Sequence, residues 1–67
     1  MNTTKQMPRH GQFVAVWTAP TGELMSSTLR WVDGRLHAFQ EFPLNRWVPD
    51  LEDPTWYEEV NATFMTL

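Results

Sequence analysis

Two tight turns constrain this chain more than any other feature of its sequence. Asp33-Gly34 stands between two runs rich in β-branched and aromatic residues, where a type I′ turn requires positive φ at both positions. Pro20-Thr21-Gly22 predicts a second, three-residue turn further towards the N-terminus. The segments that these turns join are expected to be strands, at residues 12–18, 24–32 and 35–40. The sequence therefore predicts an antiparallel meander.

The two turns also fix which residues face each other. The expected pairs include Phe13–Leu29, Ala15–Ser27, Trp17–Met25, Leu29–Ala38, Trp31–Leu36 and Ser27–Gln40. Because side chains alternate between the two faces of a sheet, both turns place apolar residues on one common face. That face is expected to hold Phe13, Ala15, Trp17, Met25, Leu29, Trp31, Leu36 and Ala38. We expect the core on this side, with Ser27 as its one polar member.

The remaining chain divides by composition. Its expected segments are a flexible N-terminal tail at 1–10, the meander at 11–48, an acidic loop at 49–54 and a helix or strand at 55–66. Within the meander, residues 46–48 favour a short fourth strand that Pro49 ends. The predicted fold class is mostly β (α+β), a single small domain with a three- to four-stranded antiparallel meander.

Residues 55–66 carry signals for two structures. Asp53 is a good N-cap with Pro54 in the first helical position, and Glu58 and Glu59 are expected near the positive helix start. One helical stripe would be formed by Trp56, Val60 and Phe64. The same residues also alternate as in a strand, so a short helix and an extra strand both remain open.

Composition excludes much chemistry. The chain has 67 residues and no cysteine, so it has no thiol nucleophile, redox pair or thiolate metal site. The two histidines, His10 and His37, lie far apart in the sequence, and no Gly-rich phosphate loop is present. We expect no enzyme activity, no catalytic residue, no metal and no cofactor. No apolar run has the length of a membrane span, and a cytoplasmic location is expected.

Charge is distributed unevenly along the chain. The first 46 residues carry five Lys and Arg against three acids, whereas residues 47–67 carry five acids and no Lys or Arg. Large aromatic residues accompany these acids, and aromatic side chains outside a core are typical interface anchors. The candidate partner-binding residues are Trp47, Asp50, Glu52, Asp53, Trp56, Tyr57 and Glu58. The alternative is that the aromatic residues complete a second small core with Leu44, Val48, Val60 and Phe64.

The second face of the meander provides the other candidate site. It brings together Arg30, Arg35, His37 and Phe39, and bases beside an aromatic ring on a sheet are typical of single-stranded nucleic-acid binding. A single ring and few bases make nucleic acid the weaker expectation. This face could also bind a protein partner. The favoured expectation is that residues 47–67 fold back and cover it.

One stretch of the chain resembles a family of small uncharacterised phage and prophage proteins. The resemblance covers about residues 11–54 and is carried by Val14-Ala15-Val16-Trp17, by Trp31 to Phe39, by Arg46-Trp47-Val48-Pro49 and by Glu52-Asp53-Pro54. The chain departs from the family in its longer segment after Pro54 and in its opening residues. The resemblance implies a compact β meander and an accessory protein of a phage or mobile element, and it supplies no catalytic residue.

Together these observations predict a small non-enzymatic accessory protein that binds a host protein in the cytoplasm of the host cell and inhibits or modulates a host enzyme. The acidic segment could act there by mimicking DNA. The alternative is a small β domain that binds single-stranded nucleic acid through Arg30, Arg35, His37 and Phe39. No membrane partner is expected, and the sequence leaves the oligomeric state open.

Overall fold

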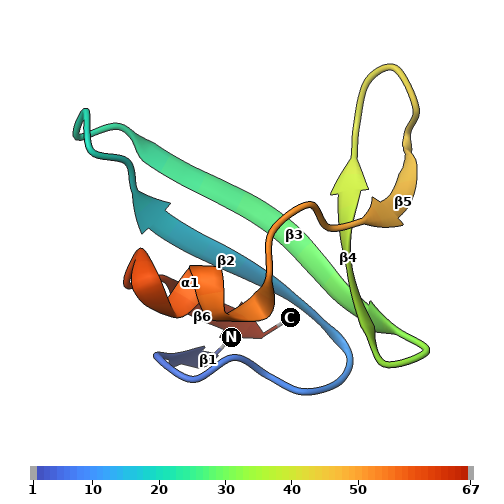
Figure 1. Ribbon diagram of the computed structural model, residues 1–67, viewed down its shortest axis with the longest axis horizontal. Helices are drawn as coiled ribbons and strands as arrows, with labels where there is room; N and C mark the ends of the chain where they lie inside the picture. Colours follow the sequence, from blue (N-terminus) through green and yellow to red (C-terminus); the bar gives the residue numbers. More distant parts are fainter. Residues whose placement is uncertain (1, 67) are drawn as a thin grey trace.

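The computed structural model describes residues 2–66, which form one antiparallel sheet of six strands and one short helix (Figure 1). The strands are β1 (Asn2–Thr4), β2 (Gln12–Thr18), β3 (Leu24–Val32), β4 (Arg35–Gln40), β5 (Arg46–Pro49) and β6 (Thr63–Thr66), and the helix is α1 (Pro54–Glu59). Their order across the sheet is β1-β6-β2-β3-β4-β5. The predicted mostly β fold is confirmed, with β1 and β6 added to the four expected strands.

Both predicted hairpins form in the expected register. Asp33 and Gly34 have φ values of 52° and 74°, the left-handed conformation that a type I′ turn requires. Across the other turn, the backbone N–H of Ala19 donates to the carbonyl oxygen of Glu23 at 2.8 Å. The resulting pairs include Phe13–Leu29, Ala15–Ser27, Trp17–Met25, Leu29–Ala38 and Trp31–Leu36, as predicted.

The pairing between β3 and β4 is shorter than predicted. It covers only Leu29 to Val32 on β3, so the expected Ser27–Gln40 pair is wrong. Along its other edge β4 pairs with β5 from His37 to Gln40, and Gln40 lies opposite Arg46. Two-stranded ribbons twist more strongly than wide sheets, and in Figure 1 the β4–β5 hairpin turns away from the long strand β3. Twist thus separates β4 from the first half of β3.

The N-terminal segment differs from the expected flexible tail. Residues 2–4 form β1, which pairs with β6 through Thr3 opposite Met65. The indole N–H of Trp31 donates to the carbonyl oxygen of Pro8 at 2.7 Å, and Met7 packs against the core. Met1 lies outside the described residues. These contacts hold the segment against the sheet because β6 offers a strand edge to which it can pair.

Residues 55–66 form both alternatives, one after the other. Helix α1 begins as predicted, with the Asp53 side chain accepting from the backbone N–H of Thr55 at 3.3 Å and Pro54 in the first turn. Glu58 and Glu59 are the last two residues of α1, beyond its first turn, so the expectation that they lie near the helix start is wrong. The chain then reverses and enters β6, which lies between β1 and β2.

Replacing Asp53 with alanine is expected to lower the free energy of unfolding by about 1 kcal/mol, because the first helical turn loses its cap. Urea unfolding monitored by circular dichroism gives this value. Asp53→Asn keeps a capping side chain and serves as the control, so an equal loss in both variants would mean that capping is not the cause.

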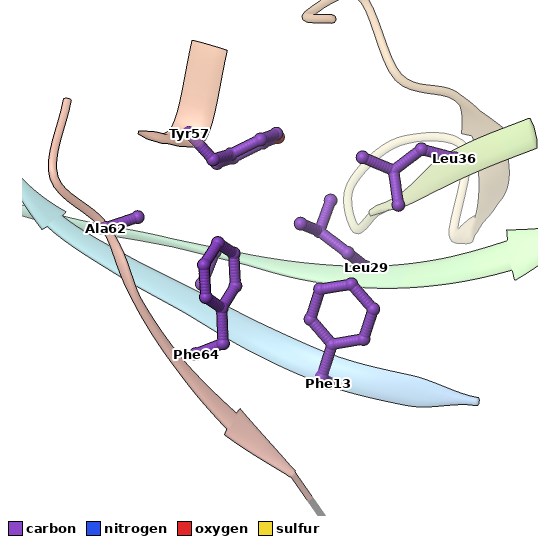
Figure 2. Packing of buried hydrophobic residues seen from close by; sticks show 7 residues of the cluster. Phe13, Leu29, Leu36, Tyr57, Ala62 and Phe64 are labelled. Atoms are coloured by element: carbon purple, nitrogen blue, oxygen red, sulfur yellow. The ribbon is translucent and has the colours of Figure 1, made fainter. Parts of the chain in front are cut away.

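Helix α1 covers the apolar face that the turns predict. The buried cluster comprises Phe13, Ala15, Leu29, Leu36, Tyr57, Ala62 and Phe64. Figure 2 shows Tyr57 descending from the helix over Phe64, with Leu29 and Leu36 beside them. The predicted helical stripe is therefore divided, because Phe64 reaches the core from β6. The expectation that residues 47–67 cover the opposite face of the sheet is wrong, since Trp56, Tyr57 and Phe64 pack on the apolar side.

Candidate binding surfaces

The face of the sheet opposite α1 carries several of the predicted site residues, and we call it the open face. By strand register it presents the half-buried side chains Val14, Val16, Thr28, Arg30, Val32, His37, Phe39, Trp47, Thr63 and Met65. The helix and the buried core lie on the other side of the sheet. Within residues 2–66, neither α1 nor the acidic loop covers this face (Figure 1).

A cation and two aromatic rings form a cluster at one end of the open face. Phe39 and Trp47 are paired across β4 and β5, and their rings meet edge to face with centroids 5.3 Å apart. The guanidinium carbon of Arg30 lies 4.7 Å from the Trp47 ring centroid, within range of a cation–π interaction. The imidazole Nδ1 of His37 is 3.0 Å from the carbonyl oxygen of Arg35. Trp47 thus lies on the predicted basic face, in contact with Arg30 and Phe39.

Charge is divided between the two sides of the sheet. Among the described strand residues that register places on the open face, the ionisable ones are Arg30, Arg35 and His37, and none is acidic. The acids of residues 47–67 all belong to the loop before α1 or to α1 itself. The open face is therefore the basic side of an acidic protein.

The seven predicted partner-binding residues do not form one surface. Trp47 lies on the open face, whereas Trp56 packs against the core and Tyr57 is only 2% exposed. Two of the acids have structural contacts, Asp50 with Tyr57 and Asp53 at the start of α1. Glu52 and Glu58 are exposed on the helix side.

Trp56 and Tyr57 join the main core rather than a second small core. Trp17 meets Trp56 with ring centroids 5.3 Å apart and Tyr57 at 5.8 Å, both edge to face. Leu44, a proposed member of the second core, is exposed. The turns place Trp17 on the predicted apolar face. The need for other aromatic residues to pack against this indole is the sequence signal from which the cluster could have been predicted.

Tyr57 is held in place by its polar end as well as by its ring. The hydroxyl donates to Oδ2 of Asp50 at 2.5 Å. Burial raises the pKa of Tyr57 well above its ordinary value near 10, and the hydrogen bond to Asp50 and the charges of Asp50 and Glu52 raise it further. The contact therefore requires a protonated phenol, and it ties the acidic loop to α1.

Tyr57→Phe is expected to cost about 1–2 kcal/mol, because it keeps the ring and removes the hydrogen bond. A raised pKa in the folded state gives stability that is complete below the ordinary tyrosine pKa of about 10 and is lost as the pH rises above it. Urea unfolding of both proteins from about pH 8 to pH 11 should show the wild-type advantage shrinking with pH. An advantage that stays constant across this range would contradict the assignment.

A cleft lies beside α1 where β3 and β4 separate. Its volume is about 320 Å³, and Ser27, Ala38 and Val48 are among the residues that line it. Trp17 and Trp56 also line it, as do the acidic residues Asp50 and Glu52. The side chains that line it in the described structure include no Lys, Arg or His.

Other kinds of site are scarce in the described part of the chain. Residues 2–66 contain no group of three or more His, Asp or Glu side chains placed to hold a metal ion. None of their helices has the length and apolar character needed to cross a membrane. The expected lack of a cofactor and of catalysis remains a prediction.

The fold and its surfaces together define a small antiparallel β domain with a half-covered sheet. No family model, curated protein or solved structure matches the chain.

Proposed function

We propose that this protein is a non-enzymatic binding protein that holds a partner protein on its open face. The observation that carries the proposal is that the only helix packs on the other side of the sheet and leaves this face without a covering layer in residues 2–66. Val14, Val16 and Met65 give the face an apolar centre. Aromatic residues, methionine and arginine are the types that are enriched in protein interfaces.

The contacts around Trp47 favour a protein partner over nucleic acid. Single-stranded nucleic acid binds by stacking bases on free aromatic faces. Here Arg30 lies over the Trp47 ring, and the Phe39 ring meets Trp47 edge to face. A base would have to displace Arg30 to stack on this indole, whereas a protein side chain can pack around the cluster as it stands.

The charge of the open face indicates the chemistry of the partner. With Arg30, Arg35 and His37 at one end of this face, a complementary partner surface has an apolar part and acidic residues at one end of it. Two copies that met through their open faces would bring like charges together, which disfavours a dimer of this kind. The resemblance to phage and prophage proteins adds that the partner is a host protein, whose activity the binding would inhibit or modulate.

Site-specific photocrosslinking tests this proposal. A benzophenone side chain at Thr28 reports on the open face, and the same group at the exposed Thr55 of α1 is the matched control. In lysate of a bacterial host, we expect a nuclease-resistant adduct with one protein from position 28 and none from position 55. Circular dichroism shows whether both variants keep the wild-type fold.

Three results would contradict the proposal. A nuclease-sensitive adduct at position 28 would indicate nucleic acid, and an adduct with a second copy of the chain would indicate self-association. Equal adducts from both positions would mean that the open face is not preferred.

A further inference from the structure

The first half of β3 has a free edge. Its register with β2 runs from Leu24 to Arg30, whereas its register with β4 begins only at Leu29. Residues 24–28 are therefore bordered by a strand on one side only. In residues 2–66 no other strand is registered against their second side.

The backbone at this edge presents hydrogen-bonding groups outwards. Glu23 accepts from Ala19, so its carbonyl group points towards β2. Backbone groups in antiparallel strands alternate between the two neighbours, so those of Leu24, Ser26 and Thr28 point to the free edge. The edge has none of the charged residues or prolines with which proteins usually protect an exposed strand. It can therefore accept another strand.

The cleft beside α1 lies along the same edge. Met25, Ser26 and Ser27 contribute to its lining, together with Gln40 on the far side of the gap. A strand added to β3 would point every second side chain towards the side of the sheet that holds this cleft. Strand addition of this kind takes affinity from backbone hydrogen bonds and specificity from the pocket that receives the alternate side chain.

The walls of the cleft suit a positive charge. Indole rings attract cations over their faces, and the cleft has the indoles of Trp17 and Trp56. Asp50 and Glu52 also line the cleft, and Asp50 uses one carboxylate oxygen for Tyr57. An Arg or Lys side chain would pack its aliphatic part against lining residues such as Ala38 and Val48 and place its charge beside these acids.

We propose that an extended basic segment of a partner protein adds as a strand to β3 at Leu24–Thr28 and places an Arg or Lys side chain in this cleft. The cleft lies on the α1 side of the sheet, and of the half-buried residues that define the open face the site includes only Thr28, at the edge, so the peptide experiment below tests this site without testing the function proposed above. A second copy of the chain is a poorer occupant. Its own β3 would offer Met25 and Ser27 to the cleft, which are uncharged, and would bring together two clefts that are each lined by Asp50 and Glu52.

Nuclear magnetic resonance titration with a short capped peptide tests the proposal. The probe is a five-residue peptide of alternating threonine and valine with arginine at its centre, and norleucine replaces arginine in the control peptide. Four tryptophans give four indole N–H signals. We expect the signals of Trp17 and Trp56 to shift, those of Trp31 and Trp47 to stay, and the amides of Leu24, Ser26 and Thr28 to gain protection from hydrogen exchange.

A pair of charge variants sharpens the test. Glu52→Gln removes one of the two acidic side chains that line the cleft and is expected to weaken binding of the arginine peptide about two- to fivefold, the range of an exposed ion pair. Glu59→Gln makes the same change on α1 away from the lining of the cleft and should leave the affinity unchanged. Asp50 is left in place because it holds Tyr57.

Each other outcome overturns the proposal in a defined way. Equal binding of the norleucine peptide removes the requirement for a cation. Indole shifts without protection of the β3 amides, or equal binding of arginine amide alone, mean that no strand is added. The β3 amides could also become more protected from hydrogen exchange as the protein concentration rises, with no peptide present. That result would mean that a second copy of the chain occupies the edge. If no signal shifts, neither the edge nor the cleft binds such a segment.

Discussion

Replacing Phe64 with alanine is expected to leave much of the protein unfolded at room temperature. Phe64 is fully buried and lies between Phe13, 5.9 Å away in an edge-to-face pair, and Tyr57 at 6.4 Å. Removing a buried phenylalanine ring costs about 3–5 kcal/mol, through lost burial and the cavity left behind. A domain of this length has a total stability of about 3–10 kcal/mol, so the loss is a large part of the whole.

The adjacent residue is the control for this prediction. Met65 points to the open face and is half-buried, so Met65→Ala should cost about 1 kcal/mol or less. Urea unfolding followed by tryptophan fluorescence measures both variants. Similar losses for the two neighbours would mean that the faces of β6 are assigned incorrectly.

Ala15 and Val16, which are adjacent in β2, test in the same way which side chains face the core and which face the open side. Ala15 is fully buried and is paired with Ser27 and Phe64, so Ala15→Glu would place a carboxyl group within the core. An unpaired buried charge costs several kcal/mol, and we expect a loss of about 4 kcal/mol or more at neutral pH. Val16→Glu puts the same group on the open face and should cost only about 1 kcal/mol.

The pH dependence separates charge burial from simple crowding in Ala15→Glu. Burial raises the pKa of the introduced carboxyl in the folded state above its unfolded value of about 4.3. The penalty for charge is then absent below the unfolded pKa and becomes complete as the pH rises through the folded one. Measured against wild type at each pH, the stability loss should be smaller near pH 4 than near pH 7. A loss that does not change with pH would indicate crowding alone.

The parts of the fold that follow from the sequence are those set by local interactions. Asp33-Gly34 determines a turn within two residues, and the turn determines the register of the strands that it joins. The start of α1 is local in the same sense, because Asp53 caps the helix from the position just before it. These elements depend on neighbours in the chain, and a single sequence contains that information.

The elements that the sequence does not reveal depend on distant partners. Residues 2–4 have no strand pattern of their own, and they form β1 because β6 provides an edge of pairing partners 60 or more residues further along. The separation of β4 from the first half of β3 comes from twist across the sheet, which no local motif marks. The side of the sheet that α1 covers likewise depends on tertiary packing of Tyr57.

The candidate site shows the same limit. Alternation alone groups Arg30, His37 and Phe39 on one face. Trp47 joins them because β5 pairs with β4, although its position in an acidic stretch of the sequence suggested a different surface. Tyr57 was expected at an interface and is instead a core residue, because the single helix must bury its aromatic side towards the sheet.

The position of β6 has a consequence for how the protein is made. A ribosome synthesises β1 and β2 first, yet these two strands are joined only by β6, near the other end of the described chain. While residues 63–66 remain within the exit tunnel, β1 has no neighbour and the sheet ends at β2. The emerging chain can form the local hairpins early, but the sheet is completed only after the last strand has left the ribosome.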